Sequence, residues 1–154
     1  MVGGLWIAIA FIPHYTRQNP FFEVMEGLEH TIALFGESEK GEFRCAYFCE
    51  NLAQLDRYLG NPPPSSLGLH YAVQALLYKR KLIYFRIPEE GYSTEDYLYG
   101  LQLLKEQKLI PQLSAICAPG LADEQLIGEI LPICNFYHSI LITNEPDFYD
   151  YLTN

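Results

Sequence analysis

The cysteines and histidines are the residues of this chain whose chemistry would suit a metal site or a nucleophile. They are Cys45, Cys49, Cys117 and Cys134 with His14, His30, His70 and His138. Zinc sites usually take closely spaced cysteine or histidine ligands, and no Cys-x-x-Cys pair occurs here. Cys45 and Cys49 lie in an expected strand, where their spacing separates them by about 13 Å, too far to share one ion. We therefore expect no metal site.

A cysteine–histidine pair is the strongest candidate for nucleophilic catalysis. Cys117 ends one strand-like segment and His138 precedes the next, so neighbouring parallel strands could bring them together. A helix N-terminus could then stabilise the thiolate. However, no Gly-x-Ser-x-Gly elbow or similar motif accompanies them. All four cysteines lie in apolar segments, where a free thiol behaves as a small hydrophobic group. We expect buried, unpaired thiols, no catalytic residue and no enzyme.

A phosphate-binding turn would need a glycine-rich loop after a strand. The turn Gly36–Gly41 follows an apolar strand, but Glu37, Glu39 and the adjacent Glu42 would repel a phosphate. No Gly-Lys-Ser/Thr sequence occurs, so this is not a P-loop and we expect no cofactor.

A second turn, Ala118-Pro119-Gly120, joins a strand to a helix. Backbone N–H groups at the start of such a helix can bind an anion. This turn, with His138 nearby, supports an alternative hypothesis: a small Rossmann-like ligand-binding or enzymatic domain.

Composition and charge exclude several classes of partner. The chain has 154 residues, 49% of them hydrophobic, which suits a single domain with a proper core. Its net charge of −9 argues against binding to nucleic acids or anionic membranes. The first twelve residues are apolar but too few to span a bilayer, and no basic residue precedes them. Together with the free cysteines, this indicates a cytoplasmic protein.

Apolar runs alternate with helical patterns along the chain, as expected for an α/β fold with three layers. We expect a mostly parallel sheet of about five or six strands flanked by helices, in a single domain. Residues 1–29 would form an N-terminal strand and an irregular arm, and residues 30–154 the α/β core. The expected strands are 5–12, 30–35, 43–48, 82–87, 113–118 and 139–143. The expected helices are 51–59, 67–79, 93–107, 121–131 and one that begins near 145.

Two details of these helices can be predicted from single residues. Ser65 or Ser66 should cap the helix 67–79, because their side-chain oxygens can accept from its first N–H groups. In the helix 93–107, the side chains expected to face the core are Tyr97, Leu98, Leu101 and Leu104.

The order of these segments resembles the α/β part of contractile phage tail sheath proteins. The similar stretches are Thr31–Gly41, Cys49–Gly60, Ser66–Leu77, Leu82–Arg86, Gly100–Leu104 and Ser114–Leu121, the last with its Ala-Pro-Gly turn. Pro13-His14-Tyr15 resembles the Pro-Gly-Val-Tyr opening of that family, with His14 in place of glycine. Glu42 stands where the family commonly has proline. The resemblance does not cover the C-terminal domain that sheath subunits direct toward the inner tube.

The resemblance implies a structural, non-catalytic domain, a reduced, truncated or orphan relative of tail sheath proteins. It would act through protein–protein contacts, by self-association or with other tail components, in the cytoplasm or within a tail-like particle. Tyrosine and other aromatic residues are common at protein interfaces. We therefore expect Tyr15, Phe21 and Phe22, on the N-terminal arm, to contact a neighbour, by addition of an edge strand.

Overall fold

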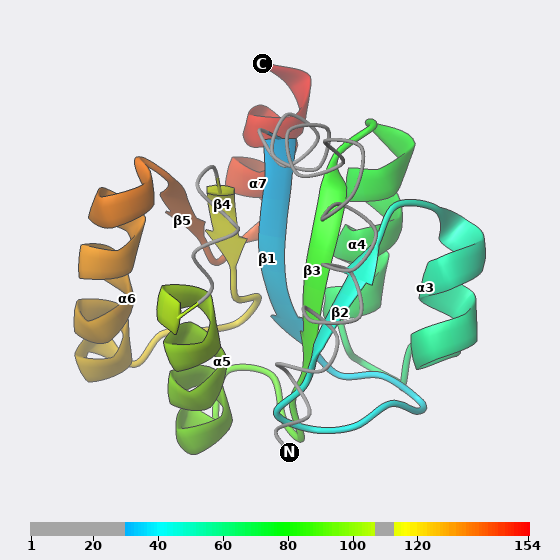
Figure 1. Ribbon diagram of the computed structural model, residues 1–154, viewed down its shortest axis with the longest axis horizontal. Helices are drawn as coiled ribbons and strands as arrows, with labels where there is room; N and C mark the ends of the chain where they lie inside the picture. Colours follow the sequence, from blue (N-terminus) through cyan, green and yellow to red (C-terminus); the bar gives the residue numbers. More distant parts are fainter. Residues whose placement is uncertain (1–29, 107–112) are drawn as a thin grey trace, which may run out of the picture.

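A five-strand sheet lies at the centre of the computed structural model, which describes residues 30–106 and 113–154 (Figure 1). Its strands are β1 (Thr31–Gly36), β2 (Ala46–Cys49), β3 (Lys81–Arg86), β4 (Leu113–Cys117) and β5 (Ile140–Ile142). They lie in the order β2-β3-β1-β4-β5. Only β2 runs antiparallel to its neighbour; the pairs β1–β3, β1–β4 and β4–β5 are parallel. The predicted three-layer, mostly parallel fold is therefore confirmed.

Helices cover both faces of this sheet (Figure 1). They are α3 (Leu52–Leu59), α4 (Gly68–Leu77), α5 (Thr94–Glu106), α6 (Glu124–Tyr137) and α7 (Glu145–Thr153). Helices α5 and α6 pack on one face, and α3, α4 and α7 pack on the other. Alternate residues of β1 point into the hydrophobic cores on the two faces of the sheet. Ala33 and Phe35 pack on the side of α5 and α6, and Ile32 and Leu34 pack on the side of α3, α4 and α7. Because both faces are covered, β1 is a continuous apolar run.

The aromatic residues of the α5–α6 face show how closely this layer packs. The Phe35 ring stacks on Phe85 with their centroids 4.8 Å apart, and Tyr97 lies 5.2 Å from Phe35. Gly100 of α5 sits directly over the Phe35 ring, since a Cβ built at this glycine would come within 2.9 Å of the ring's Cζ. The absence of a side chain at position 100 therefore lets α5 approach the sheet.

The observed elements differ most from the expected ones at two places. The third strand begins at Ala46, because Arg44 adopts a left-handed backbone with φ of 58° and Phe43 forms only an isolated bridge to Arg86. Helix α6 begins later than expected, at Glu124, and continues through Pro132 to Tyr137. Proline removes one N–H from the helix ladder, here the bond to the Gly128 carbonyl, without ending the helix.

The predicted strand 5–12 and the predicted interface residues Tyr15, Phe21 and Phe22 lie outside the described residues. Within the described ranges, none of the helices has the length and apolar character needed to cross a membrane.

Candidate functional site

The carboxyl edge of the sheet, where the parallel strands end, is the first place to look for a site. The chain passes from β1 to β3 on one side of β1, and then across to β4 on its other side. The helices of these two crossovers lie on opposite faces, so β1 and β4 flank a topological switch point. Doubly wound sheets commonly bind ligands at such a point, against a helix N-terminus.

Here the N-terminus of α4 is capped by a glutamate from a distant loop. The Oε1 atom of Glu90 accepts from the Leu67 N–H at 2.8 Å, and its Oε2 accepts from the Gly68 N–H at 2.8 Å. The same Oε2 accepts from the Glu37 N–H at 2.9 Å. Leu67 occupies the N-cap position and has no capping side chain of its own. One carboxylate therefore binds the amides that a phosphate or carboxylate ligand would use.

This cap corrects the expectation that Ser65 or Ser66 would begin the helix. The Ser66 hydroxyl instead donates to the Pro63 carbonyl oxygen at 2.7 Å, and Ser65 adopts a left-handed backbone with φ of 66°. Both residues thus belong to the turn that precedes α4. A hydroxyl one residue from a helix start is a common cap, but here the longer Glu90 side chain reaches the same amides from the β3–α5 loop.

Glu37 accepts a hydrogen bond from Glu90, and Tyr84 in turn donates one to Glu37. The Oε2 atom of Glu37 accepts from the Glu90 N–H at 2.9 Å, and the Tyr84 hydroxyl donates to the Glu37 carbonyl oxygen at 2.8 Å. Burial raises the pKa of Tyr84 well above its ordinary value, and the nearby Glu90 and Glu37 raise it further. Tyr84 is therefore a hydrogen-bond donor here and does not act as an acid near neutral pH.

Two glycines make this arrangement possible. A Cβ built at Gly68 would lie 2.6 Å from the Gly36 Cα, and the reverse holds for Gly36. A side chain at either position would also meet the Tyr84 hydroxyl. The end of β1 and the start of α4 thus touch backbone to backbone, which is why Glu90 can bond to both at once.

The turn after β4, which the sequence offered as an alternative site, is also closed by contacts within the chain. The Gly120 N–H donates to the Thr143 carbonyl oxygen at 3.2 Å. A Cβ built at Gly91 would lie 2.7 Å from the Gly120 carbonyl oxygen, so the two loops are in close contact. Helix α6 starts only at Glu124, and Asp123 caps it by accepting from the N–H groups of Gln125 and Leu126.

The structure does not bring His138 to this turn or to Cys117. Cys117 is in register with Ile142, near the carboxyl edge, whereas His138 caps the C-terminus of α6 before β5 begins. Cys117 and His138 therefore lie toward opposite ends of the strands, and the pairing that neighbouring parallel strands could allow is not found. The alternating strands and helices in the sequence place both residues near the sheet, but they do not determine at which end of a strand each residue lies.

All four cysteines are buried and unpaired, as their apolar surroundings predict. Burial raises the pKa of Cys49 to about 12 and that of Cys117 higher still. A thiolate is therefore disfavoured at both positions, and neither sulfur is a ready nucleophile. Across residues 30–106 and 113–154, no group of three or more His, Cys, Asp or Glu side chains is arranged to hold a metal ion.

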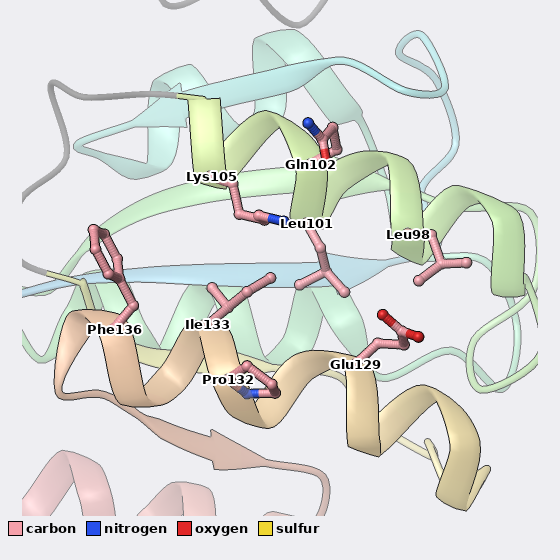
Figure 2. Close-up of a pocket in the computed structure, with 8 residues that line it drawn as sticks. All are labelled: Leu98, Leu101, Gln102, Lys105, Glu129, Pro132, Ile133 and Phe136. Carbon is pink, nitrogen blue, oxygen red and sulfur yellow. The ribbon is translucent and has the colours of Figure 1, made fainter.

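A groove with a mostly apolar lining lies between α5 and α6, and Figure 2 shows its lining. Its volume is about 530 Å³. The lining residues are Leu98, Leu101, Gln102 and Lys105 from α5, with Glu129, Pro132, Ile133 and Phe136 from α6. The floor is made by the buried Leu101 and Ile133. Lys105 lies at the Phe136 end and Glu129 at the Leu98 end (Figure 2).

Two side chains of this groove are exposed although they are large and apolar. Leu98 is 39% exposed and Phe136 is 75% exposed. The expectation that Leu98 faces the core is therefore wrong; Leu103 is buried in its place, beside Tyr97, Leu101 and Leu104. The spacing of Glu129, Pro132, Ile133 and Phe136 on one face of α6 is a sequence signal for the groove wall. What faces that wall could not be read from spacing alone.

A second groove, of about 470 Å³, lies between α4 and α7 and has a more polar lining that includes His70, Gln74 and Glu145. The Tyr71 ring stacks on Phe148 with their centroids 4.4 Å apart. Burial, with a smaller contribution from the nearby Glu145, raises the pKa of Tyr71 to about 12. This hydroxyl therefore stays protonated at neutral pH.

In comparisons with known proteins, no family model, no curated protein and no solved structure matches this chain. The class that the fold defines is a doubly wound α/β domain with one antiparallel edge strand.

Proposed function

We propose that this protein is a structural, non-catalytic α/β domain, similar to the corresponding part of phage tail sheath proteins, that acts through protein–protein contacts. The observation that carries the proposal is the Glu90 carboxylate on the first amides of α4, at the edge where such folds bind anionic ligands. A ligand at that point would have to displace a carboxylate held by three N–H groups.

The candidate reactive groups also support a role without catalysis. Cys49 and Cys117 are buried thiols with raised pKa values, and Tyr71 and Tyr84 are protonated hydroxyls. Perturbed groups mark an active site when they converge in a cleft around a reacting position. Here burial accounts for most of each pKa shift, and the hydroxyl of Tyr84 is already used within the fold.

The apolar surface supports a role in protein contacts. Tyr92 is 75% exposed, Leu131 is 47% exposed and Ile140 is 51% exposed. Aromatic and aliphatic side chains on a surface are enriched where partners bind. Tyr15, Phe21 and Phe22 would add a second contact element on the N-terminal arm, and the partner would be another copy or another component of a tail-like particle.

Light scattering across a concentration series tests self-association. We expect the mass of the purified full-length chain to rise with concentration. A variant with Tyr15, Phe21 and Phe22 changed to serine should stay at the monomer mass. A wild-type chain that is a monomer at every concentration would contradict self-association.

Calorimetric titration with inorganic phosphate, ATP and NAD tests the absence of an anion site. We expect no binding heat from any of these probes. Saturable binding of any of these probes would contradict the absence of an anion site on which the non-catalytic role is argued.

A further inference from the structure

We propose that the groove between α5 and α6 is covered by the apolar N-terminal segment of the same chain, Met1–Ile12. This inference goes beyond the proposed function, because it concerns a contact within one molecule. It rests on the groove's lining, on the composition of the segment and on the position at which the described chain begins.

The groove presents a surface that an apolar segment would stabilise. Its floor is Leu101 and Ile133, and its rim includes Leu98 and Phe136, which are 39% and 75% exposed. Covering these side chains would remove apolar area from water, which is favourable. Lys105 and Glu129 contribute one charge of each sign, so the groove favours an uncharged occupant over an acidic or a basic one.

The segment Met1–Ile12 has the matching composition. It contains no Asp, Glu, Lys or Arg, in a chain whose net charge is −9. Its large apolar residues are Leu5, Trp6, Ile7, Ile9, Phe11 and Ile12. A run of this kind costs free energy in water, and burial against an apolar surface of the same protein offsets that cost.

The geometry of the fold brings the two together. Helices α5 and α6 both run opposite to the parallel strands, so they end at the edge of the sheet where β1 begins (Figure 1). The described chain also starts at that edge, at His30, and Phe136, near the C-terminus of α6, lines the end of the groove toward the same edge. Residues 13–29 can span up to roughly 55 Å when extended. The groove's lining spans seven residue steps on each helix, about 11 Å, so the connection is long enough.

The chain's own segment is favoured over a segment from a second copy. A short covalent connection gives an effective concentration in the millimolar range, far above the usual concentration of a purified protein. The groove between α4 and α7 is a poorer receptor, because polar atoms make up a larger share of its lining and it lies on the opposite face of the sheet.

Trp6 is the single tryptophan of the chain, so its fluorescence reports on the segment without any label. In the full-length wild-type protein at low concentration, we expect blue-shifted emission and weak quenching by acrylamide. Leu98→Lys and Phe136→Lys, made singly, should each shift the emission to longer wavelength and increase the quenching. Leu77→Lys on α4 is the matched control: this leucine is 57% exposed and outside the groove, and its replacement should leave Trp6 unchanged.

Circular dichroism on every variant checks that the domain stays folded. Because two groove residues are replaced separately, the test still holds if one variant fails to fold. Emission typical of a solvent-exposed tryptophan in the folded wild type would overturn the inference. So would blue-shifted emission that is lost on dilution, because the segment would then occupy another copy. A monomer with concentration-independent, blue-shifted emission that both groove variants abolish would support it even if self-association fails.

Discussion

Glu37 and Glu90 each accept a hydrogen bond from the backbone N–H of the other, and both distances are 2.9 Å. The two residues lie 53 positions apart in the chain, in the loops that follow β1 and β3. Two carboxylates this close would repel each other without donors between them. Here the amides of Glu37, Glu90, Leu67 and Gly68 supply those donors. The pair therefore joins two loops and one helix start at the carboxyl edge.

Glu90→Ala should destabilise the domain by about 2–3 kcal/mol, because it removes the cap of α4 and leaves partly buried amides without partners. Urea unfolding followed by circular dichroism measures this loss. Glu89→Ala is the control: its side chain is exposed in the same loop, and the change should be within about 0.5 kcal/mol of wild type. Equal stabilities for the two variants would show that Glu90 does not act as a cap.

Gly68→Ala should destabilise the domain by about 1–3 kcal/mol, because the new methyl group would collide with the Gly36 backbone. Gly128→Ala is a matched change within another helix, at an exposed position where a Cβ would meet no atom within 4 Å. That substitution should stabilise by up to about 1 kcal/mol, since alanine favours the helix. Thermal or urea unfolding of both variants checks the opposite signs, and a neutral Gly68→Ala would contradict the close backbone contact.

Stability should fall as the solution becomes alkaline. Burial raises the pKa of Cys49 and of Tyr97 to about 12, from ordinary values of 9.0 and 10.0. Above about pH 9 the unfolded chain therefore releases these protons before the folded chain does, so the folded state binds more protons and loses stability as pH rises. Urea unfolding between about pH 8 and pH 11 should show a progressive loss.

Cys49→Ala provides the control for this alkaline loss. Removing the thiol should weaken the pH dependence in the lower part of the window, although the cavity lowers stability at every pH. A wild-type unfolding free energy that stays constant through this range would show that these groups are not buried as described.

Local patterns in the sequence were sufficient for most of the fold. Alternating apolar runs and helical spacings predicted the α/β class and the flanking helices, and apolar surroundings predicted that all four cysteines are buried. The expected boundaries of β1 and α3 agree with the structure to within one residue. These features depend on near neighbours in the chain, where periodicity and capping preferences act.

The tertiary structure alone decided which distant groups meet. A serine beside α4 was the expected cap, yet Glu90 takes that place from 22 residues away in the chain. Leu98 has the spacing of a core residue, yet the position of α6 leaves it on the rim of a groove. Cys117 and His138 are close in the order of elements, yet they occupy opposite ends of neighbouring strands. In each case the outcome depends on how strands and helices pack across the sheet, and spacing along the chain carries no information about that distance.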